Sequence, residues 1–219
     1  MLCAAPLLAQ QPLSSFQQQK ARALLRTQLS CLGCHELDGD GGRSAPSLTT
    51  VGSRRSAAYI RAVIEDPQRA VPGAAMPATP MPVTTRELLI QFLSRDANIV
   101  SAFVPPSSPT SPSKPRDGAA LYGRWCASCH GANGRGDGAN AKFLPVRPAV
   151  HANAAQMRER SDDALYDAVA GGGAVMGKSA RMPAFGATLA REDIRSLVAQ
   201  LRVLCRCEGP AWSRPRMRP

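Results

Sequence analysis

The chain has 219 residues, of which 44% are hydrophobic, 20% charged and only 5% aromatic. These values are typical of a soluble globular protein, and the length suits two small domains or one of medium size. No stretch reaches the roughly 18 consecutive apolar residues that a membrane-spanning helix needs. The formal net charge is +11, but no basic stripe interleaves with aromatic residues and no nucleic-acid-binding motif is present, which argues against nucleic acid as a partner. A partner with an acidic docking surface, or a membrane surface, fits the charge better.

The N-terminal segment is apolar. Residues 1–10 are similar to the end of a secretory hydrophobic region followed by a small-residue cleavage site, although the positively charged beginning is missing. We therefore interpret residues 1–13 as the remnant of a truncated signal peptide, with a merely apolar N-terminus as the alternative.

A first helical domain is expected over residues 14–100. Apolar residues at helical spacing predict a helix that runs into Cys31. The apolar face of that helix consists of Phe16, Ala21, Leu24, Leu25 and Leu29. A glycine-rich loop follows at residues 38–42, and a second helical pattern over residues 59–64 is stopped by Pro67.

The end of the first domain combines a loop with a helix. Residues 71–82 form a loop rich in proline and methionine, and the next helix opens with a capping box from Thr84 to Glu87. The apolar face of this helix consists of Leu88, Leu89, Phe92 and Leu93.

Residues 101–116 are interpreted as a Pro/Ser-rich linker. Five prolines over residues 104–116 exclude a helix and favour an extended, semi-rigid strut. The chain divides there into two halves of similar size.

The second domain, residues 117–204, repeats the order of the first. Asp117 is the expected N-cap of a helix that runs into Cys126, and a glycine-rich loop follows. Ser161 caps a helix that ends at residues 171–173. The apolar face of the final helix consists of Ile194, Leu197, Val198 and Leu201. Neither half shows a convincing alternating strand pattern, so the expected fold class is all-α, repeated twice.

Each half contains one Cys-x-x-Cys-His string, at residues 31–35 and at residues 126–130. On a helix, positions i and i+3 share a face, so two thiols can bond the two vinyl groups on one edge of a porphyrin, and the imidazole that follows can bind the iron. The sequence therefore predicts two covalently bound haem c groups. The attachment residues are Cys31, Cys34, Cys126 and Cys129, and the first axial iron ligands are His35 and His130.

The second axial ligand of each iron is expected to be methionine, which raises the reduction potential. His151 is the only histidine outside the two strings, so two bis-histidine haems are impossible within this chain. The candidates are Met76, Met81, Met176 and Met182. Met76 and Met182 lie the same distance before the first strong apolar position of the last helix in their half, and a proline follows each of them, so we predict these two as ligands, with Met81 as the alternative to Met76.

Each ligand histidine also needs an acceptor for its other ring nitrogen, normally a backbone carbonyl. Pro46 lies at a suitable distance after His35. After His130, Pro148 is the favoured candidate and Pro145 the alternative.

Both halves resemble class I cytochrome c domains, the small all-α fold that holds one haem, and the resemblance covers residues 20–95 and 117–204. In the second half, Gly118 and Tyr122 are similar to the family's first helix, and the segment from Gly177 to Gly186 is similar to its methionine loop. The resemblance implies that the first and last helices cross near the haem, with Tyr122 and Leu197 at the contact. It also implies export to the periplasm or an equivalent compartment, because c-type cytochromes mature on the outer side of an energy-transducing membrane.

The expected function is that of a dihaem electron carrier of a respiratory chain, not an enzyme, working by outer-sphere transfer between redox partners with acidic docking surfaces. One alternative is the cytochrome subunit of a periplasmic dehydrogenase or oxidase complex, with a membrane-bound partner. A less favoured alternative is a dihaem peroxidase in which His151 supplies a distal ligand or base, although such a histidine is more often a packing residue. A zinc or disulfide-exchange module is the third alternative, but the βαβ setting and the extra ligands are missing.

Residues 205–219 form a basic tail that contains Cys205 and Cys207. A bridge between these two cysteines would be strained, so a bridge to Cys3, an intermolecular bond and free thiols also stay open. A poorly ordered tail is the favoured interpretation, with Trp212 as a residue that packs on the second domain or on a partner.

Overall fold

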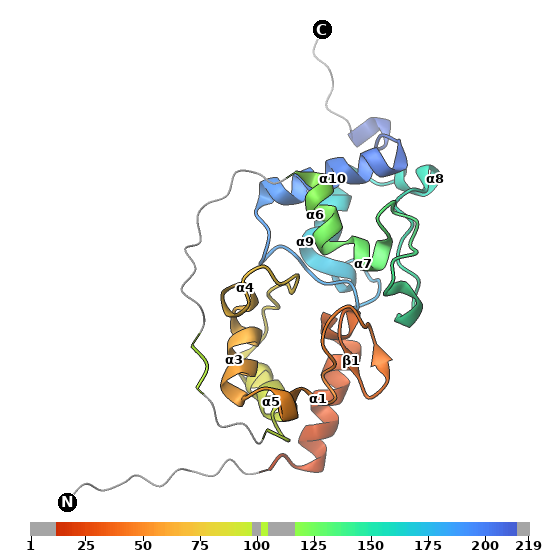
Figure 1. Cartoon of the computed structure of the whole chain (residues 1–219). Coiled ribbons are helices and arrows are strands. Elements are labelled where there is room, and N and C mark those ends of the chain that lie inside the picture. The colour runs from red at the N-terminus through yellow and green to blue at the C-terminus, as the bar shows by residue number, and fades with distance from the viewer. Residues whose placement is uncertain (1–11, 98–101, 105–116, 214–219) are drawn as a thin grey trace, which may run out of the picture.

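The computed structural model describes residues 12–97, 102–104 and 117–213. Within them the chain forms two helical domains, coloured red to yellow and green to blue in Figure 1, each with its own hydrophobic core. The predicted linker lies outside the described residues except for 102–104. There the Phe103 ring meets the Tyr59 ring edge to face, with the centroids 4.9 Å apart, so the chain is still packed on the first domain at this point.

The all-α fold with two tandem domains is confirmed in the described residues. The first domain contains α1 (Ser15–Thr27), the 3-10 helix η1 (Ser30–Gly33), β1 (Glu36–Leu37), β2 (Asp40–Gly41), α2 (Val51–Arg54), α3 (Ala57–Glu65), α4 (Pro67–Ala70) and α5 (Val83–Leu93). The second contains α6 (Gly118–Trp125), α7 (Ala127–His130), η2 (Ala141–Phe143), α8 (Ala154–Met157), α9 (Asp162–Val175), α10 (Arg191–Cys205) and η3 (Ala211–Ser213). In the part of the chain that the structure describes, no helix is both long and apolar enough to cross a membrane.

Helix α1 is shorter than predicted. It opens with a capping box in which the Ser14 and Gln17 side chains bond each other's backbone N–H groups. The helix ends at Thr27, so Cys31 lies in η1 and not at the end of α1. Of the predicted apolar face, Ala21 and Leu25 are buried, but Phe16 is 71% exposed because the first turn of the helix extends beyond the core. The predicted signal remnant lies outside the described residues except for positions 12 and 13.

The two short strands were not predicted. They pair antiparallel, with Leu37 opposite Asp40, directly after the first string. Asp38 and Gly39 between them take positive φ angles of 52° and 85°, which is the conformation of a two-residue hairpin turn. A run this short carries no alternating pattern from which a strand could be predicted.

The predicted capping box of α5 is wrong. The helix begins one residue earlier than Thr84, and its N-cap, Pro82, makes no side-chain hydrogen bond. The Glu87 carboxylate instead pairs with both terminal nitrogens of the Arg61 guanidinium on α3, at 2.5 and 2.6 Å. A bidentate ion pair between helices therefore replaces the local cap, and Arg61 holds the pKa of Glu87 below its usual value.

The predicted caps of the second domain are confirmed, and the helix that Ser161 caps breaks within the predicted residues 171–173. Asp117 accepts a hydrogen bond from Ala120 N–H, and Ser161 accepts one from Ala164 N–H. The backbone of Gly172, with a φ of 76°, is not helical, and a separate short helical piece follows as far as Val175. Glycine adopts this positive φ without steric cost.

The first and last helices of the second domain cross at close range, as predicted (Figure 1). A Cβ atom on Gly118 would lie 2.2 Å from the carbonyl oxygen of Ser196, so the crossing needs a residue without a side chain here. Tyr122 and Leu197 are both buried in the core that α6 and α10 share. In the first domain, α1 also packs on α5.

The end of α10 is anchored by Arg202. Its guanidinium donates to the carbonyl oxygens of Met157 at 2.8 Å and Arg160 at 2.5 Å, and to the Asp162 carboxylate at 2.8 Å. These bonds hold the segment before α9 against the last turns of α10.

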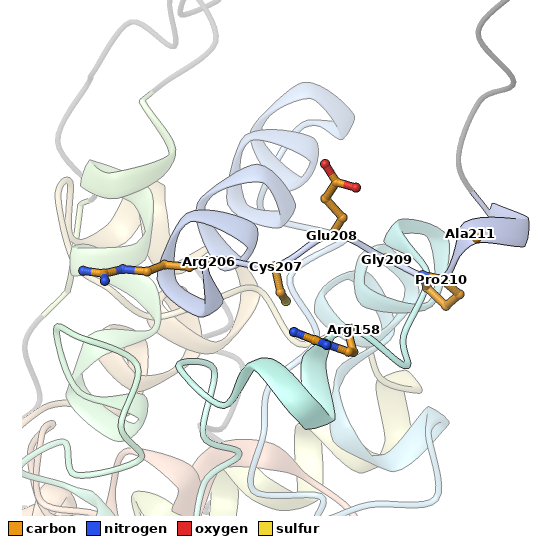
Figure 2. Close-up of a pocket in the computed structure, with 7 residues that line it drawn as sticks. All are labelled: Arg158, Arg206, Cys207, Glu208, Gly209, Pro210 and Ala211. Carbon is orange, nitrogen blue, oxygen red and sulfur yellow. The ribbon is translucent and has the colours of Figure 1, made fainter.

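The C-terminal segment closes on itself through a disulfide between Cys205 and Cys207. Arg206 between them takes a left-handed conformation with φ of 50°, and the two Cα atoms lie 5.2 Å apart. This disulfide closes a turn at the start of the predicted tail, and residues 214–219 of that tail lie outside the described residues. Trp212 is 80% exposed and does not pack on the second domain. Figure 2 shows the pocket beside this turn, which is lined by Arg158, Arg206, Cys207, Glu208, Gly209, Pro210 and Ala211.

The helix crossing predicts opposite effects for two glycines of α6. Gly118→Ala should lower the free energy of unfolding by about 1–3 kcal/mol, because the added methyl group meets the Ser196 carbonyl and forces the helices apart. Gly123→Ala is the matched control, since a Cβ there meets nothing within 4 Å, and it should stabilise the helix by about 0.5–1 kcal/mol. Denaturant unfolding of the purified protein measures both, and equal stabilities would contradict the close crossing.

Candidate haem-attachment sites

The first Cys-x-x-Cys-His string folds into one tight turn. The backbone N–H of His35 donates to the carbonyl of Cys31 at 2.9 Å, and the thiols of Cys31 and Cys34 are partly buried and form no disulfide. The His35 ring nitrogen Nδ1 lies 2.6 Å from the Pro46 carbonyl oxygen, as predicted. This contact leaves Nε2 as the nitrogen available to a metal.

The second string repeats the turn at the end of α6. The backbone N–H of His130 donates to the Cys126 carbonyl at 2.9 Å, and its ring Nδ1 lies 3.0 Å from the carbonyl oxygen of Ala149. The predicted acceptors, Pro148 and its alternative Pro145, are therefore wrong. The Pro148 carbonyl faces Gly136 instead, where a Cβ would lie 2.8 Å from it, so the next carbonyl along the chain turns toward the histidine.

Burial shifts the pKa values of the thiols and imidazoles in both strings. It raises the pKa of the Cys31 thiol to about 11 and that of Cys126 to about 12, and it lowers the pKa of His35 and His130 against the opposing effect of their carbonyl contacts. Both imidazoles are therefore neutral at neutral pH, which is the form that binds iron. Thiols with raised pKa values make poor nucleophiles, which argues against the disulfide-exchange alternative.

The loops that carry the predicted methionine ligands are fixed through their backbones. The Met76 carbonyl accepts a hydrogen bond from the Gln68 side chain at 2.9 Å, and the Met182 carbonyl accepts one from the Gly173 N–H at 3.1 Å. Met81 packs against the hydrophobic core of the first domain. Axial ligation by the two predicted methionines stays a prediction.

His151 lies beside the histidine of the second string and not across from it. Its ring stacks on that of His130, with centroids 4.1 Å apart and an interplanar angle of 16°, and its Nδ1 lies 2.9 Å from the Tyr122 hydroxyl. Burial, followed by the charges of His130 and Arg160, lowers the pKa of His151 to about 3. These contacts agree with the interpretation of His151 as a packing residue, because its ring lies against the histidine of its own string and not opposite it.

The residues present fit a covalently attached haem. Trp125, directly before Cys126, is buried and its Nε1–H has no hydrogen-bond partner, which suits a group that brings its own acceptors, as haem does with its propionates. The Trp125 ring meets Phe185 edge to face at 5.8 Å. The zinc alternative would need three or four side-chain ligands together, and among the described residues no group of three or more His, Cys, Asp or Glu side chains is placed to hold a metal ion.

Asn140 joins the two attachment segments. Its side chain is 2% exposed; Oδ1 accepts from the Arg43 N–H at 2.6 Å, and Nδ2 donates to the Gly33 carbonyl at 2.5 Å and lies 3.5 Å from the Cys129 sulfur. Burial and then the proximity of Cys129 raise the pKa of the Cys34 thiol. One buried carboxamide therefore connects a residue inside the first string with a cysteine of the second.

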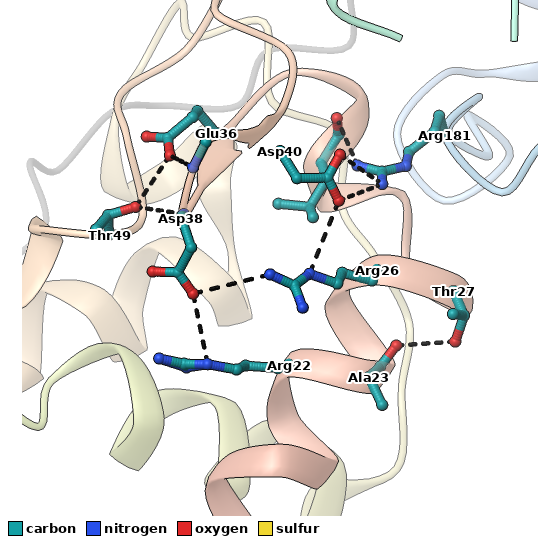
Figure 3. Close-up of polar contacts among 11 residues, drawn as sticks. Arg22, Ala23, Arg26, Thr27, Glu36, Asp38, Asp40, Thr49 and Arg181 are labelled. Carbon is teal, nitrogen blue, oxygen red and sulfur yellow. Dashed lines mark hydrogen bonds and ion pairs between the residues drawn. The ribbon is translucent and has the colours of Figure 1, made fainter. Parts of the chain in front are cut away.

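Arg181 makes a second contact between the domains, shown in Figure 3. It directly precedes Met182, and its buried guanidinium donates to the Leu32 carbonyl at 3.1 Å and to the Asp40 carboxylate at 2.9 and 3.2 Å. A Cβ on Gly33 would lie 2.0 Å from the Arg181 carbonyl oxygen. The first attachment segment thus packs directly on the methionine loop of the second domain.

Neither Asn140 nor Arg181 was predicted from the sequence. Asn140 belongs to a polar, glycine-rich region in which nothing marks one side chain as buried. Arg181 offers a weak signal, since it is a charged residue next to a candidate ligand, but its partners are 149 and 141 residues away. A further bond between the domains runs from Ala78 N–H to the Thr188 hydroxyl at 2.8 Å.

Comparisons with known proteins give a consistent result for the two halves. A family model described as cytochrome c matches residues 19–104, and a model described as cytochrome c oxidase, cbb3-type, subunit III matches residues 113–200. No curated protein matches the chain. A solved chain from a reducing HAO-like protein complex of Kuenenia stuttgartiensis is similar at 20% identity over 79% of each chain, with a TM-score of 0.34. That score is too low to support a conclusion about fold or function.

The domain contact predicts unequal effects for two of its hydrogen-bonding side chains. Asn140→Leu leaves the Gly33 carbonyl and the Arg43 N–H without a partner and should lower the free energy of unfolding by about 1–3 kcal/mol. It should also increase the radius of gyration measured by small-angle scattering. Thr188→Val, which removes one part-buried bond of the same contact, is the control and should cost about 1 kcal/mol or less. Equal losses and unchanged dimensions in both variants would show that Asn140 does not hold the domains together.

Proposed function

We propose that this chain, which belongs to the cytochrome c family and has two class I domains in tandem, is a dihaem protein that carries single electrons between redox partners. Electron transfer and haem binding follow from the family, and the number of haems and their ligands are the finer part of the proposal. The observation that carries it is the pair of Cys-x-x-Cys-His turns. Each has two unpaired thiols and a neutral imidazole held at Nδ1 by a backbone carbonyl.

When bound, haem supplies an iron that alternates between the ferric and ferrous states. Cys31, Cys34, Cys126 and Cys129 would attach it, and His35 and His130 would bind its iron. Met76 and Met182 complete the proposed ligand set, supported by the hydrogen bonds that fix their loops and by the proline after each of them. A thioether ligand favours the ferrous state and so suits a carrier of high potential.

The contact between the domains supports passage of the electron within one chain. Asn140 and Arg181 join the first attachment segment to the second, so the two sites are held together by packed and hydrogen-bonded groups. In the proposed mechanism an electron enters at one site and leaves from the other, by outer-sphere transfer, with no substrate bound at either.

A more specific proposal is that the protein serves a membrane-bound oxidase or dehydrogenase. The match of residues 113–200 to a model named for an oxidase subunit favours this association, and the net charge of +11 suits an acidic docking surface on the partner. Export to the periplasm or an equivalent compartment belongs to the same proposal, because covalent haem attachment takes place there.

The haem count tests the proposal directly. Protein expressed in a host that matures c-type cytochromes should show the added mass of two haems, and paired Cys31→Ala/Cys34→Ala or Cys126→Ala/Cys129→Ala variants should each lose one. A redox titration should then take up one electron per haem. An intact mass without any added haem, or a stoichiometric zinc content, would rule the function out.

The methionine assignment predicts distinct spectra for three variants. Met76→Ala and Met182→Ala should each remove the contribution of one haem to the thioether-to-iron charge-transfer absorption, because each loses one axial ligand. Met81→Ala should leave that absorption intact and lower the free energy of unfolding by up to about 2 kcal/mol, because Met81 packs against the core. If the absorption is lost in Met81→Ala and kept in Met76→Ala, the ligand of the first site is Met81.

A further inference from the structure

The two attachment sites differ at one matched position. The carbonyl that accepts the ring N–H of the string's histidine belongs to Pro46 in the first domain and to Ala149 in the second. Two residues further along the chain lies Leu48 in the first domain and His151 in the second. The internal repeat therefore places an aliphatic side chain at one site and an imidazole at the other.

The imidazole of His151 is held in place from two sides. It stacks on the His130 ring with the centroids 4.1 Å apart, and the Tyr122 hydroxyl lies 2.9 Å from its Nδ1. The backbone also fixes its position, because the N–H of Ala152 donates to the Gly134 carbonyl at 2.9 Å, and a Cβ on Gly134 would lie 3.0 Å from the His151 Cβ. The ring therefore has little freedom to leave its place against the proximal histidine.

The corresponding position of the first domain is apolar. Leu48 is buried and belongs to the hydrophobic core of that domain, together with Leu32 and Leu37. The first domain contains no histidine other than His35. The second domain therefore has a hydrogen-bonded pair of polar rings where the first has an aliphatic residue.

We propose that His151 is a positioning residue that makes the two haem sites unequal, by giving the second a lower reduction potential than Leu48 gives the first. The inference rests on the proposed dihaem function. Oxidation adds one positive charge at a site, and polar groups around a metal ligand stabilise the more highly charged oxidised state better than an aliphatic side chain does. Stacking on His130 also fixes the plane of the ligand ring.

The test exchanges the two residues in the full-length dihaem protein. His151→Leu should shift the potential of the second site upward and leave that of the first unchanged, and Leu48→His should shift the first site downward. Potentiometric titration followed by optical absorption measures both steps. The Met76→Ala and Met182→Ala variants assign each step to its domain. Mass spectrometry of every variant should still show two haems.

Tyr122→Phe provides an independent variant that keeps both histidines. It removes only the hydroxyl that bonds His151 and should shift the second step upward, in the same direction as His151→Leu. If His151→Leu fails to bind two haems, this variant carries the test alone. A second step that does not move in a variant loaded with two haems would overturn the inference and leave the electron-carrier function intact, whereas the absence of covalent haem would overturn the function itself.

Discussion

The hydrogen bond from Nδ1 of each motif histidine to a backbone carbonyl is the interaction on which both sites depend. It orients the rings of His35 and His130 and leaves Nε2 as the nitrogen open to a metal. Burial keeps both imidazoles neutral, because it lowers their pKa against the opposing effect of this hydrogen bond. It also ties the loop after each motif to the motif itself. The residue two positions after the carbonyl therefore occupies a matched position in both domains. This residue is Leu48 in the first domain and His151 in the second.

The two domains are joined by more than the proline-rich segment between them. Asn140 and Arg181 reach from the second domain into the first attachment segment, and both side chains are buried at the contact. Buried polar groups of this kind are costly unless every hydrogen bond is made, so the contact favours one relative orientation of the domains over others. A linker alone limits only the distance between domains, and the side-chain bonds determine which surfaces meet.

Local chemistry could be predicted from the sequence, and contacts between distant residues could not. The caps at Asp117 and Ser161 were predicted because a capping side chain bonds a backbone group three residues away. The capping box at Thr84 failed because the Glu87 carboxylate found a stronger partner on another helix. Asn140 gave no signal, since its partner in the first domain is 107 residues away. The turn of each Cys-x-x-Cys-His string and the hydrogen bond of its histidine to a backbone carbonyl could be predicted, because they depend on residues close together in the sequence.

Gly33 gives the first motif a constraint that has nothing to do with porphyrin chemistry. The two middle positions of a Cys-x-x-Cys-His string do not touch the iron, yet a side chain at this one would run into the Arg181 backbone of the neighbouring domain. The glycine thus allows the first domain to pack against the Arg181 backbone of the second domain. A chimaera that joins this first domain to an unrelated cytochrome would keep the haem-binding string but lose the contact with Arg181. A first domain from another protein would pack on Arg181 only if it had glycine at this position. One position inside the Cys-x-x-Cys-His string therefore limits which domain can pack beside it.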